Sequence, residues 1–120
     1  MSGELPPQIQ NQLAQLQQLQ QQAQAVMTQK TQIEGLIRET EAALKELDKS
    51  SDNAVIYKNV GELLFRADKP KLVEELKERK DMMDIRLKTM AKQEERIQGR
   101  FTQLQEQLKQ SLGQIPPKGG

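Results

Sequence analysis

The chain has 120 residues, of which 35% are hydrophobic and 2% aromatic, and its formal net charge is +1. It is one domain by length, but it holds too little apolar material for a broad layered core, so we expect an elongated protein. Cysteine and histidine are absent, which removes disulfides, thiolate nucleophiles, imidazole bases and the usual zinc ligands. We therefore expect no metal site and no cofactor.

Charge and hydropathy also limit the partners. The 18 basic and 17 acidic residues are mixed without the basic block that phosphate neutralisation requires, so nucleic acid is not an expected partner. The first residues form no signal segment, and no apolar run approaches the ~20 residues of a membrane span. The sequence therefore predicts a soluble cytoplasmic protein with no membrane partner.

Enzymatic chemistry is not expected either. Adjacent acids such as Glu74 and Glu75 point in different directions on a helix, and no glycine loop of the phosphate-binding kind occurs. An enzyme using acidic residues remains a distant third hypothesis, and we predict no catalytic residues.

The first predicted element is a helix over residues 8–49, with residues 1–5 flexible. Pro6 and Pro7 precede it, at a helix start where missing amide donors cost nothing. From Gln8 to Gln29 no residue is charged, but leucines and alanines keep helical spacing and glutamine is a good helix former. The heptad a and d positions, nine of twelve apolar, are Ile9, Gln12, Leu16, Leu19, Ala23, Val26, Lys30, Ile33, Ile37, Thr40, Leu44 and Leu47.

A β-hairpin is predicted over residues 54–66. Its two segments are rich in β-branched, aromatic and aliphatic residues. Asn59 and Val60 fit a type I turn, and Gly61 fits the left-handed residue that would complete a three-residue loop. The residues expected to mediate assembly through this hairpin are Val55, Ile56, Tyr57, Val60, Gly61, Leu63, Leu64 and Phe65.

A second helix is predicted over residues 69–112, with residues 116–120 flexible. Asp68 is the expected N-cap, Pro70 is tolerable in the first turn, and Gly113 with Pro116-Pro117 ends the helix. Nine of its twelve a and d positions are apolar, and the twelve are Val73, Leu76, Lys80, Met83, Leu87, Met90, Glu94, Ile97, Phe101, Leu104, Leu108 and Ser111.

The two heptad patterns fit together if the chain reverses at Val60. That reversal sets a positions of one helix opposite d positions of the other, for example Leu44 against Leu76 and Leu16 against Leu104. The predicted fold is therefore dominated by α-helix, as a single domain over residues 1–120: a long antiparallel two-helix coiled coil with a short β-hairpin at the bend. The alternative is a structural or tethering protein, a parallel homodimer in which residues 50–70 form a flexible break.

The hairpin and the narrow coiled coil both predict partner chains. Burial of the seam side chains supplies a free energy comparable to the cost of ordering the helices. A lone two-stranded hairpin is marginal in water, and its unpaired edges are templates for further strands. We therefore expect several hairpins to join in an intersubunit β-barrel from which the coiled coils project.

These residues suggest a family. The long first helix, the segment Val55-Ile56-Tyr57-Lys58-Asn59-Val60-Gly61 with Leu63, then Lys77-Glu78-Arg79 and the second heptad helix closely resemble the beta class of archaeal prefoldin. The resemblance covers nearly the whole chain. It implies an ATP-independent chaperone, a hexamer of two alpha and four beta subunits that holds non-native proteins and passes them to a group II chaperonin. The heavy glutamine content near the two ends departs from the family pattern.

In such an architecture, the client-binding surface would lie near the two ends of the chain. Apolar residues there stand among uncharged glutamines, which suits varied unfolded clients. These residues, including Leu13, Leu112 and Ile115 outside the strict seam, could instead simply close the coil, and both interpretations stay open. The candidate client-binding residues are Ile9, Leu13, Leu16, Leu19, Leu104, Leu108, Leu112 and Ile115.

Overall fold

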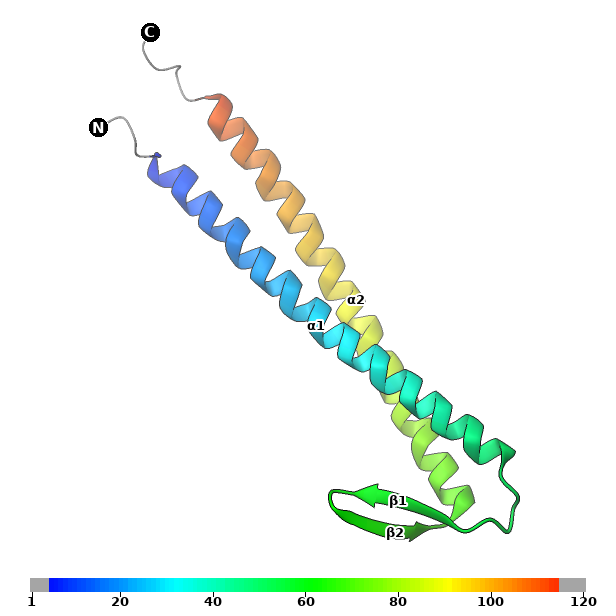
Figure 1. The fold of residues 1–120 in the computed structure, drawn as a ribbon. Coiled ribbons are helices and arrows are strands. Elements are labelled where there is room, and N and C mark those ends of the chain that lie inside the picture. Colours follow the sequence, from blue (N-terminus) through cyan, green and yellow to red (C-terminus); the bar gives the residue numbers. More distant parts are fainter. Residues whose placement is uncertain (1–4, 115–120) are drawn as a thin grey trace. The chain divides into compact units, whose positions relative to one another are not determined.

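The structure, a computed structural model, describes residues 5–114. Along the chain it contains α1 (Pro7–Lys49), β1 (Ile56–Val60), β2 (Leu63–Ala67) and α2 (Lys69–Gly113), as Figure 1 shows. These residues divide into two compact units. The terminal unit holds residues 5–29 and 90–114, and the hairpin unit holds residues 30–89.

The start of α1 follows the proline pair. The amides of Ile9 and Gln10 both donate to the Pro6 carbonyl at 3.0 Å, and Pro7 is the first helical residue. Proline suits this position because its ring already holds the helical φ and its missing N–H would have had no partner. At the other end, the Ser50 hydroxyl donates to the Leu47 carbonyl at 2.7 Å and satisfies one acceptor of the last turn.

The start of α2 has the predicted cap. The Lys71 amide donates to Oδ2 of Asp68 at 3.3 Å, and the Leu72 amide donates to the Asp68 carbonyl at 2.9 Å. A carboxylate that accepts from the third helical amide is the usual N-cap arrangement. Pro70 follows in the first turn, as predicted. The helix ends at Gly113, while Pro116, Pro117 and the predicted flexible residues 116–120 lie outside the described residues, as do residues 1–4.

The hairpin turn differs from the prediction. β1 and β2 pair antiparallel from Ile56 with Ala67 to Val60 with Leu63, so the loop is only Gly61 and Glu62. Asn59 and Val60 belong to β1, and the prediction of a three-residue loop reversing at Val60 was wrong. The left-handed conformation of Gly61 is confirmed by its φ of 62°. A glycine with positive φ in the first position of a two-residue loop matches the right-handed twist of the strands better than a type I turn does.

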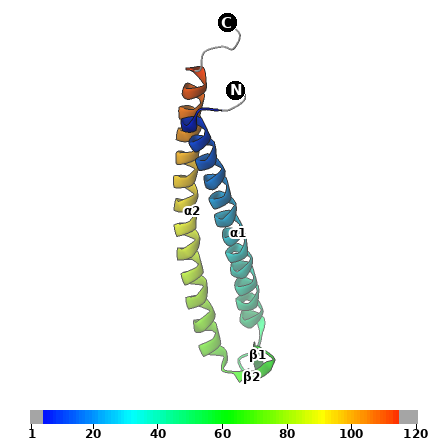
Figure 2. The ribbon, with the colours of Figure 1, turned by 90° about the vertical axis from the view of Figure 1, so that its left-hand side faces the viewer.

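In the terminal unit, the two helical segments pack along the predicted seam. They run alongside each other in opposite directions, as the blue and orange ends show in Figures 1 and 2. Ile9, Leu19, Met90 and Leu104 are buried there. The remaining seam positions of this unit are half-buried, and Gln12 Nε2 donates to Ser111 Oγ at 3.2 Å across the pair. The heptad pattern therefore predicted which residues face the partner helix.

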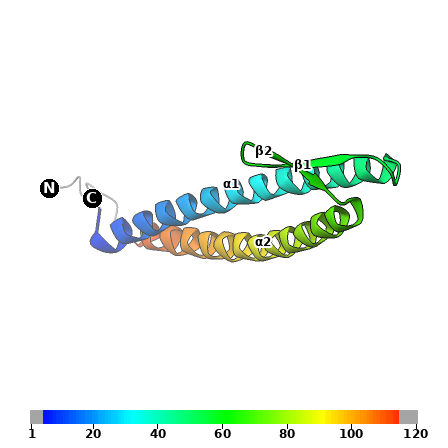
Figure 3. The same cartoon turned by 90° about the horizontal axis from the view of Figure 1, so that it is seen from below.

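The hairpin unit has the same seam. Ile33, Ile37, Thr40, Leu47 and Met83 are buried, and the other predicted seam positions of this unit are half-buried. The Thr40 hydroxyl donates to the Leu36 carbonyl at 2.8 Å, which satisfies its polar group in the seam. Figure 3 shows the two strands leaving α1 and α2 at the ends that this unit contains.

The alternative of a parallel rod does not fit this fold. Residues 56–67 form a paired hairpin rather than a flexible break, and in both units the seam of α1 packs against α2 of the same chain. An ion pair of 3.9 Å between Lys80 Nζ and Glu41 Oε1 crosses the two helices in the hairpin unit. The predicted fold, an antiparallel two-helix coiled coil with a β-hairpin between the helices, is confirmed.

Candidate interaction surfaces

The hairpin presents two different faces. Side chains alternate along a strand, and directly paired residues share a face. One face carries Ile56, Lys58, Val60, Leu63, Phe65 and Ala67, and the opposite face carries Tyr57, Asn59, Leu64 and Arg66. We call these the Lys58 face and the Tyr57 face. Both faces contain large apolar groups, which is unusual for a sheet that packs on one side only.

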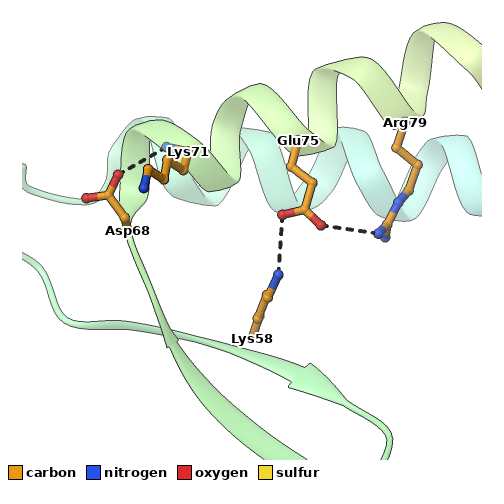
Figure 4. A network of polar contacts seen from close by, with 5 residues as sticks. All are labelled: Lys58, Asp68, Lys71, Glu75 and Arg79. Carbon is orange, nitrogen blue, oxygen red and sulfur yellow. Dashed lines mark hydrogen bonds and ion pairs between the residues drawn. The ribbon is translucent and has the colours of Figure 1, made fainter.

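An ion-pair network orients the Lys58 face toward α2. Lys58 Nζ lies 3.3 Å from Glu75 Oε2, and Arg79 Nη2 lies 3.7 Å from Glu75 Oε1 on the same helix. Figure 4 shows the Glu75 carboxylate between the two cations, with Lys58 reaching up from β1. All three side chains are more than one-third exposed, so solvent screens the attraction. The network therefore orients the hairpin more than it stabilises it.

A second contact joins the two helices at the base of the hairpin. Lys69 Nζ donates to the Ser50 carbonyl at 2.8 Å and lies 3.6 Å from Asp52 Oδ1. The Lys69 side chain is only 17% exposed. Because Ser50 follows the last residue of α1, the ammonium group sits where the helix leaves unpaired carbonyls and a partial negative charge. This contact fixes the two helix ends between which the hairpin is inserted.

Most of the predicted assembly residues are exposed. Leu64 is 66% exposed and Phe65 47%, while Ile56 is half-buried. The exposed members are Val55, Tyr57, Val60, Gly61, Leu63, Leu64 and Phe65. Within the described residues, β1 and β2 form a sheet of two strands only, so the outer edge of each strand has no strand beside it. Exposed apolar side chains on both faces, together with open edges, are features of a surface that other chains cover.

The predicted client-binding residues separate into two groups. Ile9, Leu19 and Leu104 are buried in the seam. Leu16 and Leu108 are half-buried. Leu13 and Leu112, which fall outside the seam, are 42% and 46% exposed. Ile115 lies outside the described residues. The structure brings the described members together in the terminal unit, but only Leu13 and Leu112 are exposed.

Three features of these surfaces were not predicted from the sequence. Met82 and Ile85 are strongly exposed on α2, and heptad analysis could have found them as apolar residues outside the seam. The Lys58–Glu75 and Lys69–Ser50 contacts depend on the orientation of the hairpin, which periodicity does not specify. A polar hollow of about 380 Å³ in the terminal unit, lined mostly by glutamines, also left no pattern in the sequence.

Among the described residues there is neither a metal-binding cluster nor a helix able to span a membrane. Residues 5–114 hold no group of three or more acidic, histidine or cysteine side chains placed to bind a metal ion. Neither described helix combines the length and the apolar character needed to cross a membrane.

Comparison with known proteins identifies the family. The family model for prefoldin subunits matches residues 10–115. The chain belongs to the prefoldin subunit family. It is 73% identical to a prefoldin subunit beta of Methanothrix thermoacetophila over the full length of both chains. It is also 57% identical to one of Methanococcoides burtonii, with 94% of this chain and 97% of the relative covered. The predicted resemblance to archaeal prefoldin of the beta class is thus confirmed.

A solved prefoldin structure supports the same conclusion. The crystal structure of the prefoldin beta subunit from Thermococcus strain KS-1 matches with a TM-score of 0.82 at 37% sequence identity, covering 95% of this chain and 98% of the other. Prefoldin subunits are chaperone components that form hetero-oligomers with other prefoldin subunits. A chaperone-associated function follows for this chain from its family.

Proposed function

We propose that this chain is a subunit of an ATP-independent chaperone that captures non-native polypeptides and delivers them to a group II chaperonin. It has no catalytic role and requires no cofactor. The functional complex is a hexamer of two alpha and four beta subunits. We place this complex in the cytoplasm, as its family implies.

The observation that carries this proposal is the exposed apolar hairpin in a member of the prefoldin family. Leu64 and Phe65 project from opposite faces of a two-stranded sheet with open edges. Further strands on those edges would pair the free backbone groups and cover both apolar faces. The hairpins of neighbouring subunits would in this way form an intersubunit β-barrel, and the hairpin would serve assembly.

Client capture is then assigned to the terminal unit. Leu13 and Leu112 are exposed there, and Leu13 stands among uncharged residues, since residues 8–29 of α1 contain no charged side chain. An apolar surface without charges has little electrostatic selectivity and suits varied unfolded chains. Each contact is weak, so useful affinity requires several subunits of one complex to bind the same client.

The test is suppression of aggregation of a chemically denatured protein on dilution. The full-length chain, assembled with its partner subunits, is compared with the variant Leu13→Gln/Leu112→Gln. We expect the variant to assemble normally and to protect several-fold less well. The control is Met82→Gln, which removes an even more exposed apolar side chain from the hairpin unit and should leave protection unchanged.

Two outcomes would count against the proposal. If the wild-type complex does not suppress aggregation at all, the chaperone activity is refuted. If the Leu13/Leu112 variant protects as well as the wild type, clients bind elsewhere. Transfer is tested separately, by adding a group II chaperonin with ATP and measuring recovery of the native client, which should exceed spontaneous refolding.

A further inference from the structure

The terminal unit contains a hollow whose lining is almost entirely made of carboxamide groups. Its volume is about 380 Å³. We call it the amide cavity, and the residues that line it are Gln8, Gln12, Gln107, Gln110, Ser111 and Gln114. Each carboxamide can donate and accept hydrogen bonds at once, and the serine hydroxyl can do the same. None of these side chains carries a charge.

Gln12 occupies a special position in this cavity. It lies at a seam position, and its Nε2 donates to Ser111 Oγ at 3.2 Å. Its Oε1 is buried and has no hydrogen-bond partner. Exchanging the oxygen and nitrogen positions would not remove the problem, because the nitrogen would then be the buried group without a partner while the oxygen accepted from Ser111. A buried polar atom without a partner is costly. A ligand in the hollow reaches this oxygen only when the Gln12 side chain turns toward the hollow, and the cost of leaving it without a partner in the seam favours that turn.

The chemistry of the lining restricts the ligand. A charged ligand would find no countercharge among the lining side chains, and an apolar ligand would leave the carboxamides without partners. A group that is neutral and both donates and accepts matches a carboxamide, and the peptide group has this character. Extended polypeptides expose peptide groups that folded proteins have already paired, so non-native chains offer the matching ligand.

We propose that the amide cavity hydrogen-bonds main-chain amides of non-native polypeptides, with Gln12 as the central residue. This inference rests on the proposed chaperone function and adds a polar component to it. The exposed leucines of the same unit contact client side chains, which differ among clients. The carboxamides bind the backbone, which all clients share. The glutamine-rich sequence of this unit then contributes to recognition.

The test compares two peptides by fluorescence anisotropy. One is a labelled apolar peptide that lacks Asn and Gln, and the other has the same sequence with alternate backbone amides N-methylated. N-methylation removes backbone donors and keeps the side chains. We expect the wild-type complex to bind the unmodified peptide about three- to tenfold more tightly, the range of one or a few hydrogen bonds. In Gln12→Met this preference should disappear.

The variants separate the cavity from its surroundings. Methionine is close to glutamine in size and suits a seam position, and Gln12→Leu provides a second variant in case the first does not assemble. Gln18→Met is the matched control, because Gln18 is exposed on the same helix and outside the cavity, and it should keep the wild-type preference.

Equal discrimination between the two peptides by wild type and both Gln12 variants would overturn the inference. A third peptide, with glutamine side chains added to the same sequence, provides another outcome. If the complex prefers this peptide and N-methylation of its backbone does not reduce the preference, the cavity binds side-chain amides and the inference is also overturned. Either result leaves aggregation suppression by the wild-type complex intact. Loss of that suppression would refute the proposed function instead, so the two failures are distinguishable.

Discussion

Lys58 of β1 and Glu75 of α2 are linked by an ion pair of 3.3 Å, which connects the hairpin to the helix that follows it. The pair is separated from the covalent connection at Asp68 by several residues on each side. It therefore acts as a second attachment point. A hairpin held only by its covalent connections could rotate about its base, whereas this additional contact limits the directions in which its apolar faces can be presented to a neighbouring subunit.

A double-mutant cycle on Lys58 and Glu75 tests this role. Both side chains are more than 40% exposed, so we expect a coupling energy of less than about 1 kcal/mol that falls as salt is added. Lys58→Met and Glu75→Gln should instead increase the rate of amide hydrogen exchange in β1. A coupling of several kcal/mol, or unchanged exchange in β1, would contradict an orienting role.

Gly61 and Gly99 provide opposite predictions for the same substitution. Gly61 has a φ of 62°, and a Cβ there would meet no atom within 4 Å, so Gly61→Ala is opposed only by backbone strain. We expect a loss of about 1–2 kcal/mol in the free energy of unfolding. Gly99 lies within α2, also with open space around it, and Gly99→Ala should stabilise by up to about 1 kcal/mol. Denaturant midpoints at one fixed protein concentration measure both changes.

The sign of each change is the critical outcome. If Gly61→Ala were neutral, the turn would tolerate another conformation and the left-handed glycine would not be required. If Gly99→Ala lowered the free energy of unfolding, the surface of α2 at Gly99 would contact another subunit of the complex. Either result would need a different account of that glycine.

Substitutions at Lys69 and Asp52 distinguish the effect of a part-buried hydrogen bond from that of an ion pair with an exposed carboxylate. Lys69→Met removes the donor to the Ser50 carbonyl while keeping the apolar part of the side chain, and we expect a loss of about 1–3 kcal/mol in the free energy of unfolding. Asp52 is fully exposed, so Asp52→Asn should cause no measurable change. Thermal unfolding of the assembled complex measures both, and equal effects would show that the ion pair, not the carbonyl contact, matters.

Sequence reasoning predicted the helices and their contacts better than the hairpin and the polar site. Every predicted seam position is buried or half-buried, because a heptad repeat maintained along a helix specifies one face. The turn was placed wrongly because Asn59 and Val60 are compatible with either a turn or a strand, and the choice depends on cross-strand pairing. The partnerless Oε1 of Gln12 could not be predicted, since it depends on one side-chain conformation among many glutamines.

Assembly through the hairpin should depend on both faces of its sheet. Leu64 and Phe65 lie on opposite faces of the sheet and are largely exposed in the single chain. If both faces are covered in the complex, Leu64→Gln and Phe65→Gln should each weaken association with partner subunits, because each would bury a polar amide in an apolar contact. Helix content should stay unchanged, since neither residue belongs to the seam.

Light scattering measures the mass of the complex at several dilutions, and Met82→Gln on α2 serves as the exposed control. If only one hairpin variant dissociates, a single face is covered and a closed barrel is excluded; if neither dissociates, the subunits associate through another surface.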